Sequence, residues 1–163
     1  MAGVPAEILA RAEFPPVEDV ILPILRSALP GVDVGTLIDS GHPDMFPFVL
    51  VRAYSAIGGG GWGGDERFLE SAPFSVHTFT DGVEADREGA LLSEAARCAL
   101  RDASLGRLVI PDVAAVIKIT MTSRPRRVPD WATSTGPVQY ADLPAGTTRY
   151  ESIYRAAYRS RRH

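Results

Sequence analysis

Lysine and cysteine are almost missing from this chain, since Lys118 and Cys98 are the only ones among 163 residues. A single cysteine excludes an intramolecular disulfide. No apolar run approaches the roughly 18 residues of a membrane-spanning helix, so we expect no membrane contact. The net charge of −3 lacks the basic excess that general nucleic-acid binding requires. The length suits one domain, 1–163, with its own core.

Catalytic and metal-binding patterns are also scarce. No Gly-x-Ser-x-Gly elbow is present, and the three histidines are scattered without metal-ligand spacing. His42 and Asp44 could form a metal or acid–base pair, but a polar turn explains them more simply. We expect His77 on the surface of a sheet, and Cys98 buried and inert on a helix. The residues therefore indicate no enzyme, no metal and no cofactor.

Hydrophobic periodicity predicts an α+β domain, with a mainly antiparallel or mixed sheet and two packed helices. Its predicted order is α-β-β-β-α-β-β. The elements expected are helix 17–28, strands 32–38, 47–57 and 67–80, helix 84–104, strand 113–122 and a last segment, 149–160, that could be helix or strand and that we favour as a strand. We expect residues 1–14 to be flexible and 123–147 to form an extended loop.

Several residues predict local details of these elements. Pro23 should kink the first helix or delay its start. Pro73 suggests an edge position or a bulge in its strand. Asp81 could cap the second helix, whose small residues would let it lie close to a sheet.

The stretch IGGGGWGGDERF, residues 57–68, has six glycines and one tryptophan. A dinucleotide-binding loop must lead into a helix whose N-terminus meets the phosphates, and here a strand is predicted next. No Gly-Lys-Ser/Thr follows either. We therefore interpret the stretch as a hairpin tip whose glycines allow movement and whose Trp62 contacts another subunit.

Arginines gather at two places, after the strand 113–122 and near the C-terminus. They could be solvated, or they could contact an acidic surface of a neighbouring subunit. Together with the two tryptophans they make up the candidate interface residues, which are Trp62, Arg124, Arg126, Arg127, Trp131, Arg155 and Arg159.

The order of segments resembles the tail terminator proteins of long-tailed, siphovirus-type phages that infect actinobacteria. The segments are LPGVDVGTLI, then FPFVLVRAYSAIGGGG, then an Ala-rich helix with an acidic start, then an aromatic and arginine-rich end. The matching pieces are the PFVLVR strand Pro47–Arg52, the glycines Gly58–Gly64, the helix Ala90–Leu100 and the closing Arg149–Arg155. The resemblance covers about residues 17–160, and its motifs are structural.

The resemblance implies a non-enzymatic virion protein. Such proteins form a homo-hexameric ring that caps the finished tail tube, ends its polymerisation and joins the tail to the head-side connector. DNA would pass through the ring without specific binding. The implied place is the neck region of the virion tail, after assembly in the host cytoplasm. The implied partners are other copies of the chain, the tail tube protein and the connector.

Three other functions stay open on the sequence. One is a head–tail connector or neck protein of the same kind of virion. Another is a small enzyme that uses the glycine stretch or His42 and Asp44. The last is a generic binding domain.

Overall fold

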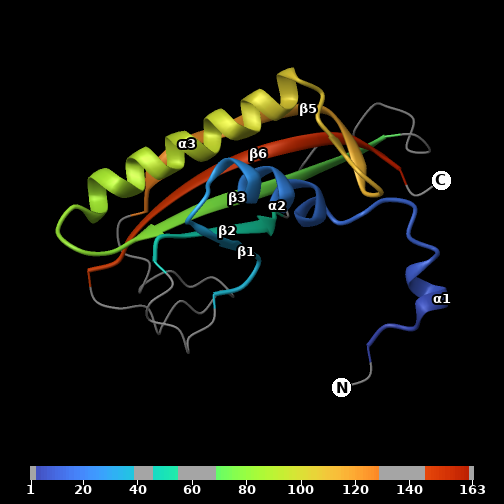
Figure 1. The fold of residues 1–163 in the computed structure, drawn as a ribbon, viewed down its shortest axis with the longest axis horizontal. Coiled ribbons are helices and arrows are strands. Elements are labelled where there is room, and N and C mark those ends of the chain that lie inside the picture. The colour runs from blue at the N-terminus through green and yellow to red at the C-terminus, as the bar shows by residue number, and fades with distance from the viewer. Residues whose placement is uncertain (1–2, 39–45, 55–68, 129–145, 162–163) are drawn as a thin grey trace.

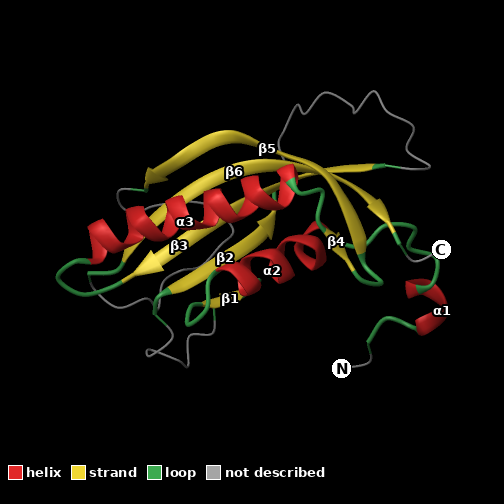
Figure 2. Ribbon diagram, turned by 45° about the horizontal axis from the view of Figure 1, so that its top comes forward, coloured by secondary structure: helices red, strands yellow, loops and turns green. Residues whose placement is uncertain are grey.

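The computed structural model describes residues 3–38, 46–54, 69–128 and 146–161. They form a six-stranded mixed sheet with two long helices on one face, as Figures 1 and 2 show. The elements are α1 (Ala6–Leu9), α2 (Val17–Ala28), β1 (Asp33–Gly35), β2 (Phe48–Ala53), β3 (Glu70–Thr80), α3 (Ala85–Leu105), β4 (Val109–Ile110), β5 (Ala114–Arg127) and β6 (Thr148–Ser160). The predicted α+β class and the approximate element order are therefore confirmed.

The strand order across the sheet is β1-β2-β3-β6-β5-β4. Only β1 and β2 pair in parallel, and the other four pairs are antiparallel. β3 and β6 form the centre of the sheet and pair from Glu70↔Tyr158 to Thr80↔Thr148. The predicted β2–β3 hairpin is present, but its glycine tip, residues 57–66, lies outside the described residues.

The two helices share one face of the sheet. α2 packs on β1, β2 and β3, while α3 packs on β3, β6 and β5. The apolar stripe of α2 is buried as its spacing predicts. α3 buries mostly small residues, and they let its backbone approach the sheet closely. Its buried residues are Ala85, Gly89, Ser93, Ala96, Leu100 and Ala103.

The faces of β3 alternate as expected. Phe74 and Val76 join the core beneath the helices, and Phe74 stacks on Tyr154 with ring centroids 5.4 Å apart. On the opposite face Phe79 packs with Phe48 and Leu50 in a smaller buried cluster. The final segment is also a strand, β6, as favoured from its aromatic content.

Other expectations about the strands were wrong. Residues 123–127 do not belong to a loop, because β5 continues to Arg127 by pairing with β6. Pro73 is not at a sheet edge, since β3 lies between β2 and β6. The carbonyl of Pro73 accepts a hydrogen bond from the N–H of Tyr54, just past the end of β2. The side of Pro73 that lacks an N–H therefore faces the end of β2, where the ladder stops.

The helix ends also differ from expectation. α2 begins at Val17 and runs through Pro23, so Pro23 does not delay its start. Glu84, and not Asp81, is the N-cap residue of α3, and no side chain caps that end. The segment 1–14 contains the single turn of α1, all of whose residues are exposed.

Candidate subunit-contact surface

Three of the candidate arginines, Arg124, Arg126 and Arg127, lie on the last part of β5. Arg126 is 3.4 Å from a carboxylate oxygen of Glu151 on β6. Arg127 points to α3, where its guanidinium is 3.3 Å from Asp86. Arg126 and Arg127 each expose more than half of the side chain. Their ion pairs therefore stabilise the fold little and leave the cations accessible to a partner.

Arg155 and Arg159 lie on β6, on the sheet face that the helices do not cover, because they alternate with the core residue Tyr154. Arg155 is half-buried and donates to the carbonyl and hydroxyl oxygens of Ser71, both at 3.4 Å. Arg159 is exposed and pairs with Ala115 of β5. The structure thus spreads the candidate arginines over two faces and does not bring them into one cluster. Trp62 and Trp131 lie outside the described residues.

A groove that the sequence did not reveal runs between α3 and β5. It consists of two adjoining hollows of about 410 and 280 Å³, both of which include Arg97 and Met121. The first hollow is near the start of α3 and is also lined by Ala90, Glu94, Arg124, Pro125 and Tyr150. The second lies under the last turns of α3 and is also lined by Leu100, Arg101, Ser104, Leu105, Lys118, Ile119 and Tyr154. The groove therefore combines an apolar floor with basic walls.

Tyr154 contributes an unsatisfied polar group to this groove. Its side chain is 2% exposed, and its hydroxyl has no hydrogen-bond partner. Burial raises the pKa of Tyr154, which keeps the phenol protonated and able to donate. The Ser152 hydroxyl opposes this rise of the pKa, but it donates its own bond to the Val76 carbonyl at 3.4 Å. A buried donor without a partner costs free energy, so this hydroxyl destabilises the fold.

β5 is an exposed edge strand along most of this groove. β4 pairs with it only at Ala114 and Ala115. Ser104 of α3 accepts a hydrogen bond from the N–H of Ile119 at 2.9 Å and so covers one edge position. The pairing of β5 with β6 shifts register between Val116 and Arg126, so the edge of β5 is not flat. An irregular edge limits pairing with strands of other molecules.

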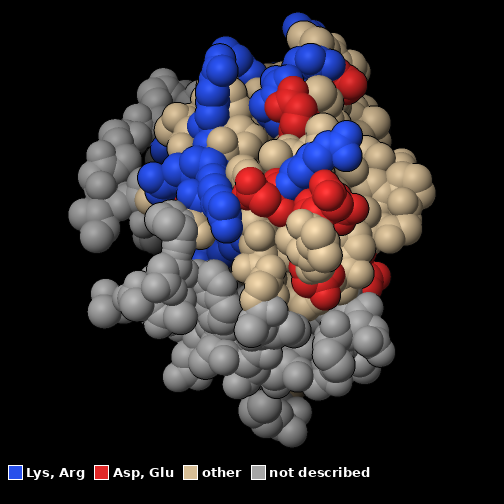
Figure 3. All heavy atoms as spheres, turned by 90° about the vertical axis from the view of Figure 1, so that its left-hand side faces the viewer, with Lys and Arg blue, Asp and Glu red and all other residues tan. Residues whose placement is uncertain are grey.

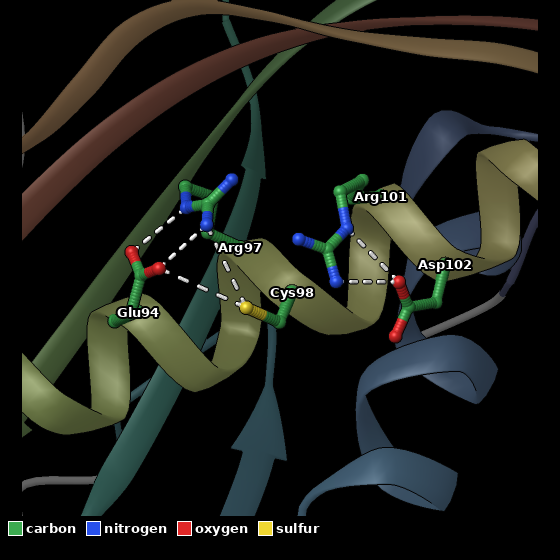
Figure 4. A network of polar contacts seen from close by, with 5 residues as sticks. All are labelled: Glu94, Arg97, Cys98, Arg101 and Asp102. Carbon is green, nitrogen blue, oxygen red and sulfur yellow. Dashed lines mark hydrogen bonds and ion pairs between the residues drawn. The ribbon is translucent and has the colours of Figure 1, made fainter.

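The outer face of α3 carries polar pairs within the helix, which Figure 4 shows. Arg97 bonds both carboxylate oxygens of Glu94, and Arg101 bonds Asp102. The bond from Arg97 lowers the pKa of the Glu94 carboxyl. Cys98 is half-exposed and only 3.8 Å from Glu94, so the expectation that it is buried was wrong. The helix is turned so that the neighbouring line of Ser93, Ala96 and Leu100 faces the core.

Acidic residues surround the start of α3. Asp81, Glu84, Asp86 and Glu88 are all exposed, and they lie at the positive end of the helix dipole. Figure 3 views this end of the molecule, where basic atoms form a band beside acidic ones. Val83 lies among the acidic residues and is fully exposed, at 102%. An apolar side chain so fully in water is available for burial by a partner.

His77 was expected on the sheet surface, but it is buried at 5% exposure. Its Nε2 is 2.9 Å from the Ser75 hydroxyl, and its Nδ1 accepts a hydrogen bond from Nε of Arg149 at 3.3 Å. The sequence could not predict this contact, because Arg149 comes from β6, 72 residues away.

The neighbours of His77 decide what chemistry it can perform. Because Nδ1 accepts a bond from Arg149, the ring proton is on Nε2, which then donates to Ser75. A histidine that activates a serine needs a free electron pair at that nitrogen and a carboxylate at the other. Burial, together with Arg149 and Arg52, lowers the pKa of His77 to about 3. Ser75 and His77 are therefore arranged as structural residues and not as a nucleophile and its base.

The described residues include neither a metal-binding cluster nor a membrane-spanning helix. Within residues 3–38, 46–54, 69–128 and 146–161, no group of three or more His, Cys, Asp or Glu side chains could hold a metal ion. His42 and Asp44 lie outside those ranges. None of the described helices has the length and apolar character to cross a membrane.

No protein-family model matches the chain, and a search of curated proteins found no match.

Proposed function

We propose that this protein is a structural virion component that caps a phage tail tube as a homo-hexameric ring. In this role it ends polymerisation of the tube and joins the tail to the head-side connector, with DNA passing through the ring without specific binding. Its partners are other copies of the chain, the tail tube protein and the connector, and its place is the neck of the tail. It performs no catalysis.

One observation carries the proposal: the segments that resemble tail terminators meet in a single structural unit. The PFVLVR segment is β2, the Ala-rich segment is the middle of α3, and the closing RYESIYR segment is β6. β3 lies between β2 and β6, and α3 packs on both β3 and β6. Motifs that build one helix-covered sheet are what a shared fold requires, and so they support the resemblance beyond a chance match of short strings.

The surface also suits a ring subunit. A subunit of a closed ring needs two different contact faces, because each copy meets its neighbours head to tail. The acidic start of α3 and the hollow under its last turns lie at opposite ends of the helix and differ in character. Among the described residues, His77 is not available as a catalytic base, because it is buried and held by Arg149 and Ser75.

The test is removal of the gene from a phage that carries it, with electron microscopy of the lysate. Loss of a terminator should give tails of uncontrolled length that do not join heads, and the wild-type gene should restore them. Tails of normal length beside unjoined heads would instead favour a neck or connector protein. Normal infectious particles without the gene would overturn both functions.

A second experiment addresses the glycine tip. Trp62→Ala, combined with a shortened 57–66 segment, should weaken ring or tail assembly while the isolated protein keeps its unfolding temperature. Normal rings and normal tails from that variant would exclude the tip as a subunit contact.

A further inference from the structure

Two surface features of complementary character lie at opposite ends of α3. One is the turn before the helix, Asp81–Glu84, and the other is the hollow under its last turns, near Arg101 and Lys118. At 1.5 Å per residue, Ala85, the first residue of α3, and Arg101 are roughly 24 Å apart along the helix axis. That distance is comparable to the width of a small domain, so one copy cannot join its own two features.

The turn presents a small apolar knob with acidic neighbours. Gly82 has a φ of 90°, a conformation that an L side chain rarely adopts, and it shapes the turn so that Val83 projects into water. Asp81 and Glu84 flank Val83 and are exposed. Within the described residues neither acid forms an ion pair, in contrast to Asp86, which Arg127 and Tyr150 both contact.

The hollow presents the matching chemistry. Its volume of about 280 Å³ holds a branched aliphatic side chain with room to spare, and Leu105, Ile119 and Met121 supply apolar lining. Leu105 is 77% exposed, so this apolar surface extends out of the hollow into water. Lys118 at the rim is exposed and forms no ion pair among the described residues.

Tyr154 also lines the hollow, although its hydroxyl is buried beneath the surface. An incoming carboxylate would meet the cations Lys118 and Arg101, which both line the hollow. Charge-assisted hydrogen bonds of this kind are roughly twice as strong as neutral ones. An occupant with an apolar knob and a neighbouring carboxylate therefore suits the hollow better than a purely apolar or a basic one.

We propose that the Asp81–Glu84 turn of one copy docks into the α3–β5 hollow of the next copy. Val83 covers Leu105 and Ile119, and an acidic neighbour meets Lys118. The contact is head to tail, so repeated contacts lead either to a closed ring or to an open filament. This inference rests on the proposed ring function and specifies which surfaces form the ring.

Cysteine cross-linking tests the contact directly. In a Cys98→Ser background, the double variant Val83→Cys with Lys118→Cys should give a ladder of disulfide-linked trimers and larger species under mild oxidation at high protein concentration. Either single variant can give only dimers, because it offers one thiol per copy. The matched control is Val83→Cys with Leu37→Cys, since Leu37 is 74% exposed and follows β1 at the opposite edge of the sheet. A double variant whose products do not exceed those of this control would overturn the proposal.

Charge exchange provides an independent measurement by sedimentation. Glu84→Arg and Lys118→Glu should each weaken self-association by about tenfold or more, because each places like charges together. Combining them in one chain should restore most of the association. Additive losses in the combined variant would place Glu84 and Lys118 in separate contacts and reject the docking.

The contact and the proposed function fail in different ways. A cross-linked ladder from a protein whose gene is dispensable for tails would keep the docking and reject tail termination. Uncontrolled tails after gene removal, combined with no ladder, would keep termination and require another ring contact.

Discussion

Gly89 of α3 lies directly against Tyr150 of β6, so close that a Cβ atom on Gly89 would be 3.0 Å from Cδ2 of the ring. The same Cβ would be 2.8 Å from the hydroxyl of Thr80, which already donates to the Ala85 carbonyl at 2.6 Å. Thr80 therefore cannot turn away without losing a buried bond. This close approach sets the distance between α3 and the centre of the sheet.

We expect Gly89→Ala to lower the free energy of unfolding by about 1 kcal/mol. Alanine should gain about 1 kcal/mol as a better helix former, but overpacking costs about 1–3 kcal/mol. Ala95→Gly, in the exposed middle of the same helix, measures the effect of helix propensity alone. It should lower the free energy of unfolding by about 1 kcal/mol. Urea unfolding measures both. A Gly89→Ala protein as stable as the wild type would show that the contact is looser than described.

Removing the hydroxyl from two tyrosines of β6 should change the free energy of unfolding in opposite directions. Tyr158 donates to the Pro15 carbonyl at 2.9 Å, whereas the Tyr154 hydroxyl has no partner. Tyr158→Phe should lower the free energy of unfolding by about 1 kcal/mol, and Tyr154→Phe should raise it by about 1 kcal/mol. Denaturant unfolding of the two variants side by side provides the measurement. Equal losses would mean that Tyr154 has a partner in the free protein.

His77 predicts a pH dependence of stability. Its pKa is about 3 in the folded protein and near 6.5 when unfolded, so between those values the unfolded chain binds the proton and the folded chain does not. Stability is therefore full above pH 6.5 and falls as the pH is lowered. The loss from pH 7 to pH 5 should be about 2 kcal/mol. His77→Gln should remove that part of the pH dependence, and parallel curves for the two proteins would rule out the buried neutral histidine.

The arginines of β5 should serve as probes of assembly that leave the fold intact. Arg126→Ala and Arg127→Ala should each change the free energy of unfolding by less than about 1 kcal/mol, because their ion pairs are exposed. If these residues contact a neighbouring subunit, tail or ring assembly should fall much more than stability does. Thermal unfolding and electron microscopy of the same preparations separate the two effects. A large drop in unfolding temperature would instead assign the arginines to the fold.

The spacing of hydrophobic residues within one segment predicted the helices and strands that depend only on that spacing. The spacing of Val17, Val20, Ile21, Ile24 and Leu25 predicted α2, which begins and ends where expected. The alternation of β3 predicted which side chains face the helices. The helix 84–104 was predicted within one residue at each end, but Gly89 and Ser93 lie inward without a hydrophobic side chain to signal it.

The sequence by itself determined the helices, most of the strands and the α+β class, because hydrophobic periods and strand propensity act between near neighbours. Tertiary structure decided the rest. β5 extends through Arg127 because β6 supplies partners for its backbone, and Pro73 is tolerated inside the sheet because β2 ends beside it. His77 became a buried neutral residue only because a distant strand placed Arg149 against it. The α3–β5 groove likewise exists only between elements, so its basic walls and its unsatisfied Tyr154 hydroxyl have no signal in any single segment.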